Sequence, residues 1–445
     1  MAEIKPLAAY RYDLSAVRAE DVLTQPYDKI TPEMRRRYLT RDAHNLVRVI
    51  LGEGLSSDGE DDNVYTRAEG YLRQWIGEGV LRRDPEAGLY PYEQTFTLPG
   101  GGAAHTRRGF IALGRLEPYD RRVVHRHEQT LSGPKEDRLR LLRATHTHLG
   151  QIFMLYSDPA GRVEAELFAR AKNPVLEAGD EYGTRHRLFR ETDGGVIARV
   201  QAAMAPLPLV IADGHHRYET ALAWSQEEHR RLKHYAADPA PWDFAMMTFV
   251  NLDAPGLVVL PTHRVVHGVA DWDAGRLLER AREYFDVHER PVSAAEWERA
   301  WPALEAELAA AEQERRPAFL AALAGKPGLY LFRLRRAGVD LARELPAYND
   351  EQRQLAVLLL HELALRRGLG ITPEAVRDGQ HLRYERDAHA AVRAVWEGAA
   401  QAAFLLAPVA PRTVRDVALS GAVMPQKSTD FFPKLLSGLT LYRIE

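Results

Sequence analysis

The chain has no cysteine among its 445 residues. Disulfide bonds, thiolate zinc sites, iron–sulfur clusters and a cysteine nucleophile are therefore excluded. It also lacks an apolar run of the roughly 18 residues that a membrane-spanning helix needs. Its first residues, MAEIKPLAAYRYD, lack the apolar core of a secretory signal peptide. We therefore expect a cytoplasmic protein with no membrane partner.

A strong net charge is missing as well. Lys and Arg number 59 and Asp and Glu number 62, so the formal net charge is −3. This balance excludes a generally basic nucleic-acid coat protein and an acidic tail protein, and we expect no nucleic-acid partner, although a local basic site stays open. The length indicates about three domains or two large ones, and 45% apolar residues are typical of a globular protein.

Apolar patterns predict both strands and helices, which alternate in the middle of the chain and favour an α/β or α+β fold. We expect an N-terminal α/β region over 1–116, a core over 117–268, and a helix-rich region over 269–445 whose tail returns to the core. Individual expectations are a strand at 44–51, a hairpin of 90–98 and 107–116, and helices at 273–285, 294–315 and 352–367.

The sharpest motif is LPLVIADGHHRYETAL at 207–222. Its apolar run predicts a buried strand, Asp213 and Gly214 a sharp turn, and the rest an amphipathic helix. The free N–H groups and the dipole at such a helix start favour an anion, most often phosphate. Gly214 would let the backbone approach that anion, and Arg217 would offer its oxygens a fork of donors. Alternatively, Asp213 only caps the helix, and His215 and His216 are ordinary polar loop residues.

A second cluster, HRHEQTLSGPKEDR, spans 125–138. His125 and His127 alternate and would share one face of a strand. With Glu128 they could bind zinc, but the HExxH helix motif is absent. Glu128 is otherwise a general base for a hydroxyl nucleophile, or simply a surface carboxylate.

Further anion-binding donors lie in the second half of the chain. His263 and Arg264 form one of several His-Arg pairs, which would make a cationic pocket if they met at strand ends, or which recur by chance. In the C-terminal MPQKSTDFFPKLLSGLTLYRIE, the donors are Lys427, Ser428, Thr429 and Lys434. This segment is either a polar loop that returns to the active site or a simple anchor for the tail.

Together, IADGHHRYETAL, an early PYD, HEQT followed by GPKEDR, LPTHR and MPQKSTDFFPKLLSGL resemble a bacterial and archaeal family of unknown function over nearly the whole chain. Gln25 departs from it, because the family pattern there is Pro-Pro-Tyr-Asp. More distantly, the turn from Asp213 to Arg217 resembles the phosphate-binding turn of the ParB/sulfiredoxin-like superfamily, which includes nucleotide-dependent free-serine kinases. Sulfiredoxin chemistry needs a cysteine in that turn, and a clear basic DNA-binding domain of the ParB kind is lacking.

The resemblance implies a ParB-like module in the 117–268 core and a nucleotide-dependent phosphotransferase. Its substrate would be a small hydroxyl metabolite such as serine, or phosphoserine in reverse, and its cofactors ATP or ADP with Mg²⁺. The catalytic residues would be Glu128 as base, Asp213, which would position Mg²⁺ or a histidine, and His216. The residues expected to bind the nucleotide are Gly214, His215, Arg217, His263, Arg264, Lys427 and Ser428. The alternatives are a non-catalytic nucleotide-binding regulator, a DNA-associated protein, or a metal-dependent phosphoester hydrolase.

Overall fold

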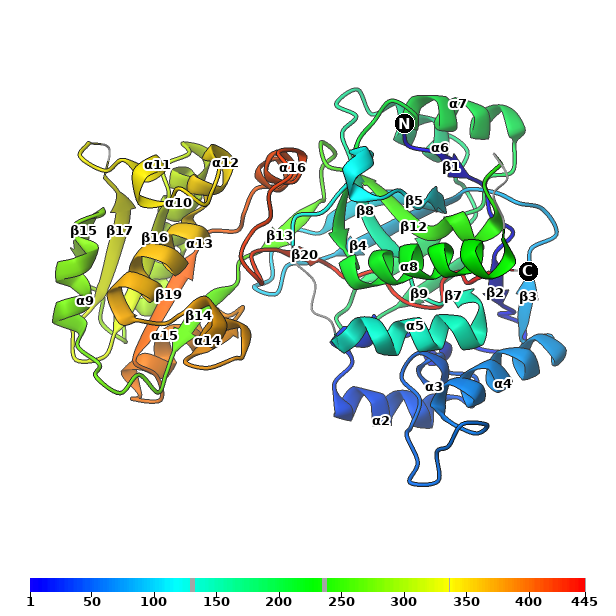
Figure 1. The fold of residues 1–445 in the computed structure, drawn as a ribbon, viewed down its shortest axis with the longest axis horizontal. Helices are drawn as coiled ribbons and strands as arrows, with labels where there is room; N and C mark the ends of the chain where they lie inside the picture. The colour runs from blue at the N-terminus through cyan, green and yellow to red at the C-terminus, as the bar shows by residue number, and fades with distance from the viewer. Residues whose placement is uncertain (129–132, 234–237, 336, 445) are drawn as a thin grey trace. The chain divides into compact units, whose positions relative to one another are not determined.

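A computed structural model describes residues 1–128, 133–233, 238–335 and 337–444 (Figure 1). Gln129 and Thr130 of the HEQT motif lie outside these ranges. The chain has an α+β fold and forms two compact units, which are described separately. Unit 1 comprises Met1–Arg126, Thr130–Leu257 and Pro433–Glu445, and unit 2 comprises His127–Gln129 and Val258–Phe432.

Unit 1 is built on a mixed sheet in the order β6-β11-β8-β12-β5-β4-β10-β9, with β1 paired to β5. The expected hairpin is confirmed, because β4 and β5 pair antiparallel. The strands of the sheet are β1 (Ile4–Lys5), β4 (Tyr90–Phe96), β5 (His105–Arg115), β6 (Val124–His125), β8 (Ile152–Tyr156), β9 (Leu176–Gly179), β10 (Arg185–Leu188), β11 (Leu209–Asp213) and β12 (Phe244–Asn251). Two further two-stranded sheets lie in unit 1. In one, β2 (Tyr10–Tyr12) pairs with β3 (Leu81–Arg83), and in the other, β7 (Thr147–His148) pairs with β21 (Tyr442–Arg443).

Helices cover one face of this sheet, and α5 packs on α8 (Figure 1). Strand residues of that face, such as Phe110 and Ile211, share a core with Val200 of α7 and Tyr218 of α8. The helices of unit 1 are α1 (Ala19–Val22), α2 (Pro32–Arg41), α3 (Val47–Ile50), α4 (Val64–Gly77), α5 (Gly133–Thr145), α6 (Arg162–Phe168), α7 (Gly194–Met204) and α8 (His215–Leu232), with short 3-10 turns η1 (Tyr27–Lys29), η2 (Tyr119–Arg121) and η3 (Pro241–Asp243).

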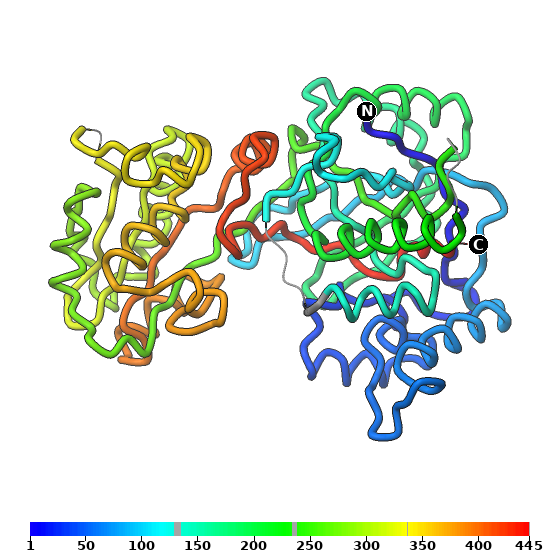
Figure 2. The backbone as a smooth tube through the Cα atoms, viewed as in Figure 1, coloured from blue at the N-terminus to red at the C-terminus, as the bar shows by residue number. Residues whose placement is uncertain are grey.

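The opposite face of the sheet is contacted by residues 433–445, which we call the tail. Successive strand residues point to opposite faces, so Arg107 and Met246 lie away from the helical core. Arg107 donates a hydrogen bond to the carbonyl of Pro433, and the Thr440 hydroxyl lies 3.2 Å from the Met246 sulfur. Figure 2 shows the tail, in red, running through unit 1. The last residues of the chain are therefore part of the sheet's packing.

Unit 2 has its own sheet, in the order β15-β17-β16-β19-β14-β18. Helices α10 and α15 pack against one face of it in a core that includes Leu320 and Leu405. The strands of unit 2 are β13 (Val258–Leu260), β14 (His263–Val266), β15 (Phe285–Arg290), β16 (Ala318–Leu323), β17 (Leu329–Leu334), β18 (Leu382–Glu385), β19 (Ala402–Leu406) and β20 (Asp430–Phe432). The helices are α9 (Ala274–Ala281), α10 (Trp297–Gln313), α11 (Leu341–Glu344), α12 (Asp350–Arg353), α13 (Ala356–Leu359), the π-helix η4 (Leu360–Gly368), α14 (Pro373–Arg377), α15 (Ala388–Trp396) and α16 (Pro411–Leu419).

Two local differences from the sequence-based expectations stand out. The strand expected at 44–51 is wrong, because Val47–Ile50 is helical and the Asn45 side chain accepts a hydrogen bond from the Val47 N–H. Helices expected at 273–285, 294–315 and 352–367 are confirmed by α9, by α10, and by α13 with η4. The strands β15 to β19 in the same part of the chain were not predicted from the sequence.

The three expected regions distribute over the two units. Residues 1–116 lie in unit 1, 117–268 contribute to both units, and 269–445 lie in unit 2 up to Phe432 and in unit 1 from Pro433. The division into three regions stays a prediction. Among the described residues, no helix combines the length and the hydrophobicity needed to cross a lipid bilayer.

Candidate functional site

The strand–turn–helix predicted from the DGHHR motif is present in unit 1. Strand β11 ends at Asp213, and α8 begins at His215. Gly214 joins them at φ +90° and ψ 28°, a left-handed conformation that costs a residue with a side chain roughly 1–2 kcal/mol. Gly214 occupies the N-cap position and has no side chain to cap the first turn, so Asp213 is not the helix cap. The start of α8 is a suitable place for an anion.

Asp213 is held by cations from distant parts of the sequence. Lys434 Nζ lies 3.1 Å from its Oδ2, Arg217 Nη2 lies 4.0 Å from its Oδ1, and the Gly214 N–H donates to Oδ1 at 2.7 Å. Burial alone would raise the pKa of Asp213. The charges of Lys434, Arg217 and Lys29 outweigh that effect and hold the pKa well below its ordinary 3.8. Asp213 is therefore ionised at any physiological pH.

A further buried cation, Arg107, also interacts electrostatically with Asp213. Its side chain is 2% exposed, and burial lowers the pKa of the guanidinium to about 10, so it stays charged at pH 7. We call Asp213, Lys29, Arg107, Arg217 and Lys434 the Asp213 cluster. The cluster carries four positive charges and one negative charge. This imbalance, beside a helix start, favours an anion.

Arg217 folds back over the turn. A Cβ atom at Gly214 would lie 3.0 Å from Arg217 Nε, and one at Gly150 would lie 3.3 Å from Nη1. The guanidinium also donates a hydrogen bond to the carbonyl of Gln151. Two glycines therefore leave room for the guanidinium, and the carbonyl fixes its direction.

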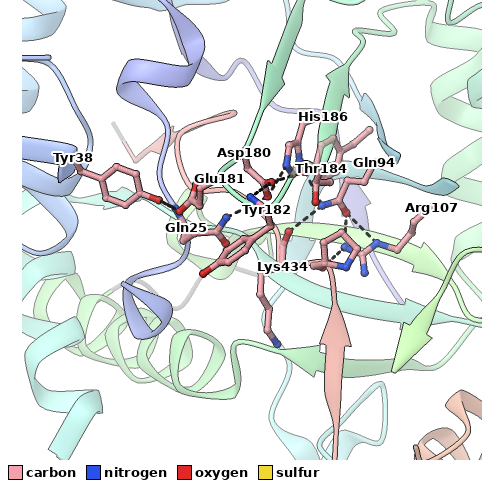
Figure 3. A network of polar contacts seen from close by, with 12 residues as sticks. Gln25, Tyr38, Gln94, Arg107, Asp180, Glu181, Tyr182, Thr184, His186 and Lys434 are labelled. Atoms are coloured by element: carbon pink, nitrogen blue, oxygen red, sulfur yellow. Dashed lines mark hydrogen bonds and ion pairs between the residues drawn. The ribbon is translucent and has the colours of Figure 1, made fainter. Parts of the chain in front are cut away.

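A buried polar network holds the backbone at Lys434 (Figure 3). Arg107 donates from Nε to Gln94 Oε1 at 3.0 Å and from Nη2 to the Pro433 carbonyl at 2.6 Å. Gln94 Nε2 donates to the carbonyl of Lys434 at 2.9 Å. The backbone of the tail is thus held at 433–434, which places the Lys434 ammonium at the cluster.

The network continues away from the cluster to a second charged group (Figure 3). His186 Nε2 lies 3.3 Å from Asp180 Oδ2, and Gln25 Nε2 donates to the same oxygen at 3.3 Å. Burial of Asp180 would raise the pKa of its carboxyl, but His186 and two backbone N–H groups lower it below its usual value. Gln25, the residue that departs from the family pattern, thus has a partner in this network.

A cavity of about 70 Å³ adjoins the cluster through Arg217. That volume is several times the roughly 10–15 Å³ that one water molecule needs. Its walls come from α3, α5, α8, the segment around β7, the PYD motif and the tail. The lining residues are Pro26, Tyr27, Ile50, Arg138, Leu141, Leu142, Thr147, His148, Leu149, Gly150, Arg217, Thr220 and Ser437.

Most of the other residues singled out in the sequence belong to unit 2, whereas His125 and Lys434 lie in unit 1. His263 is buried in β14 and accepts a hydrogen bond from the Leu406 N–H at 3.3 Å. Burial, with the charge of Arg264, lowers the pKa of His263 to about 3, so its ring is neutral. Arg264 donates from Nη2 to the carbonyls of Gln426 and Lys427, at 3.1 and 3.2 Å. His263 and Arg264 thus hold unit 2 together around the segment that carries Lys427.

Ser428 and Glu128 also lie in unit 2. The Ser428 hydroxyl donates to the Pro425 carbonyl at 2.5 Å. Glu128 lies close enough to Tyr384 for its charge to add to the effect of burial, which raises the pKa of that phenol. In unit 1, His215 is buried at the start of α8 and His216 is half-buried. The residues predicted to be catalytic or to bind the nucleotide thus fall into two groups: Asp213 to Arg217 in unit 1, and Glu128, His263, Arg264, Lys427 and Ser428 in unit 2.

Three residues around the site were not predicted from the sequence: Lys29, Gln94 and Arg107. Arg107 is followed by Arg108 in a hairpin strand, and that pattern normally marks a solvent-exposed face. Only the packing of the tail shows that Arg107 is interior. Among the described residues, no group of three or more His, Asp or Glu side chains could hold a metal ion.

The fold and the cluster define an α+β protein with an electropositive strand–turn–helix. Residues 4–357 match the family model described as "Protein of unknown function (DUF1015)". This protein belongs to that family. A comparison with curated proteins finds no significant match.

Several solved structures resemble the chain, including the following three. A free serine kinase in complex with AMP is 12% identical, with 73% of this chain and 88% of that chain covered and a TM-score of 0.34. A conserved hypothetical protein from Pyrococcus furiosus is 12% identical, with 69% and 87% covered and a TM-score of 0.31. SbnI with a C-terminal truncation, from Staphylococcus aureus, is 10% identical, with 74% and 85% covered and a TM-score of 0.32.

Proposed function

We propose that this protein binds the phosphates of a nucleotide at the Asp213 cluster and acts as a phosphotransferase on a small hydroxyl metabolite. The observation that carries the proposal is that four cations, Lys29, Arg107, Arg217 and Lys434, interact electrostatically with Asp213 at the N-terminus of α8. Phosphoryl transfer needs mainly positioning and neutralisation of charge. Backbone N–H groups of the first turn, Arg217 and Lys434 would supply both.

The cluster itself offers little to a resident metal ion. Both oxygens of Asp213 face N–H donors, and its other neighbours are cations. We therefore propose that Mg²⁺ arrives on the phosphate oxygens of the nucleotide, the mode it commonly uses. Arg217 and Lys434 would then neutralise the phosphate charge that the ion leaves.

The acceptor is tested by incubating the protein with serine and with ATP, ADP or pyrophosphate, and by following phosphoserine. Arg217→Ala should weaken nucleotide binding by about 1.5–3 kcal/mol, the range for a charge-assisted hydrogen bond. Arg230→Ala, at an exposed position on the same helix, is the matched control and should leave affinity unchanged. Equal binding by the two variants would refute the proposed site. Binding without any phosphoserine would favour the non-catalytic regulator.

Glu128 and His216 enter the proposal as its catalytic residues. Removing a general base typically costs 10²–10⁴-fold in rate. Glu128→Gln should therefore lower turnover by roughly that factor and leave the Kd of the nucleotide unchanged. A variant with full turnover would show that Glu128 is a surface carboxylate.

A further inference from the structure

Two residues that line the cavity beside Arg217 each have a buried polar side-chain atom that the protein leaves unsatisfied. His148 is 8% exposed and Thr220 is 5% exposed, and both line the cavity. His148 Nε2 and Thr220 Oγ1 have no hydrogen-bond partner among the described residues. An unsatisfied buried polar atom costs roughly 1–3 kcal/mol. Each of the two atoms has less than 1 Å² of accessible surface, so a small turn of its side chain would bring it to a ligand in the cavity, and the hydrogen bond gained would favour that turn.

The chemistry of the walls narrows the class of ligand. Ile50, Leu141, Leu142 and Leu149 supply an apolar lining, and Tyr27 adds an aromatic ring that packs against Arg138, with Arg138 Cζ 4.4 Å from the ring centroid. None of the described residues that line the cavity is Asp or Glu. A primary ammonium group, such as that of an amino acid, would find no counter-charge here. A flat, largely apolar ring with polar atoms on its edge fits these walls.

The two unsatisfied atoms can pair with donors and with acceptors. Burial lowers the pKa of His148 to about 4, so the imidazole is neutral at pH 7 and presents either a donor or an acceptor at Nε2. A hydroxyl such as that of Thr220 does both. The edge of a nucleobase carries both kinds of atom.

Arg217 links the two parts, because it lines the cavity and also faces Asp213. We propose that the cavity between α5 and α8 is a nucleobase pocket, which receives the heterocycle of the nucleotide while its phosphate binds at the Asp213 cluster. This inference rests on the proposed function and adds the recognition of the base. It assigns Thr220 and His148 as residues that contact the base edge.

The test compares three probes, AMP, adenosine and ribose 5-phosphate, by calorimetric titration of the full chain. Thr220→Val keeps the shape of the side chain and removes the hydroxyl. We expect this substitution to weaken the binding of AMP and of adenosine roughly three- to tenfold, which is the value of one hydrogen bond. The affinity for ribose 5-phosphate should stay unchanged. Arg217→Ala should weaken the binding of AMP and of ribose 5-phosphate and leave the affinity for adenosine unchanged.

Thr184→Val is the matched control. Thr184 is another buried threonine of unit 1 whose hydroxyl has no hydrogen-bond partner among the described residues, and it does not line the cavity. It should leave all three affinities unchanged. Leu142→Phe is a second variant, which fills the cavity. It should weaken the binding of AMP and adenosine more than the binding of ribose 5-phosphate.

The outcomes separate the two proposals. If AMP and ribose 5-phosphate bind equally well and Thr220→Val changes neither, the nucleobase pocket is refuted and phosphate binding stands. If Thr220→Val weakens adenosine binding but AMP binds no more tightly than adenosine, the proposed function is refuted and the pocket stands. If none of the probes binds, both are overturned.

Discussion

Asp213 depends on residues that are far from it in the sequence. Its nearest cation, Lys434, is 221 residues away, and Arg107 reaches the cluster from another strand. At this scale the sequence was informative about the DGHHR turn and about Lys434 as a donor, because motif spacing and residue type are local properties. The sequence did not predict that Lys29, Gln94 and Arg107 belong to the site, because burial of a polar side chain depends on which segment covers it.

The depressed pKa of Asp213 makes its contribution to stability depend on pH. A carboxyl whose folded pKa lies below its unfolded 3.8 stabilises the protein above that value and loses the effect as pH falls below it. Asp213→Asn should lower the free energy of unfolding at pH 7 by roughly 2–3 kcal/mol, less than for a fully buried pair because the side chain is 24% exposed. The difference from the wild type should be constant above about pH 5 and shrink below pH 4 in urea titrations.

Asp61→Asn, at an exposed position, is the control and should show no such difference. A deficit for Asp213→Asn that persists unchanged down to pH 2 would contradict the assigned electrostatic role.

The backbone at Gly214 gives a second prediction. Gly214→Ala places a Cβ in the left-handed region and within about 3 Å of the Arg217 guanidinium. It should cost at least 1–2 kcal/mol of unfolding free energy and weaken phosphate binding. Gly194→Ala, at the first residue of α7, has open space and no positive φ, and should be neutral. Thermal unfolding of both variants checks the pair, and equal melting temperatures would refute the argument.

At the scale of elements, strand–turn–helix and hairpin patterns were correctly predicted, whereas the strands of unit 2 were missed. Residues 318–323, AFLAAL, form the buried strand β16, yet their composition suits a helix equally well. The opposite error occurred at residues 44–51, where a strand was predicted and Val47–Ile50 form a helix. A short apolar run that is buried on all sides carries no periodicity, so only its packing partners decide its conformation.

The tail is the element on which the site depends most directly. Arg107→Met removes the donors to Gln94 and to the Pro433 carbonyl, which leaves buried acceptors unsatisfied at roughly 1–3 kcal/mol. We expect faster hydrogen exchange at the backbone amides of residues 434–441 and weaker phosphate binding. Arg108→Met, at the neighbouring and half-exposed position, is the control. Unchanged exchange in Arg107→Met would show that the tail is held by its apolar contacts alone.

At the scale of the whole chain, the family match ends at residue 357, but unit 1 is completed by residues 433–445. The tail buries Leu435, Leu436, Leu439 and Leu441. Burying one leucine is worth about 1.5–3 kcal/mol, so the four together approach the 5–15 kcal/mol by which a typical domain is stable.

Deletion of 433–445 should therefore leave unit 1 unfolded, which trypsin sensitivity and the loss of a cooperative thermal transition would show. Lys434→Met in the full chain separates charge from packing. It should keep the transition and lose phosphate affinity. A truncated chain that melts like the wild type would contradict the structural role of the tail.

The order of the segments also has a consequence for biosynthesis. Ribosomes add roughly 5–20 residues per second, so Asp213 is made about 11–44 s before Lys434, and the segment Val258–Phe432 of unit 2 is translated in the interval. During that time the nascent chain carries an exposed sheet face and a carboxylate that lacks its main counter-ion. Unit 1 can reach its final form only after residues 433–445 have been translated, so it is the last part of the polypeptide to mature.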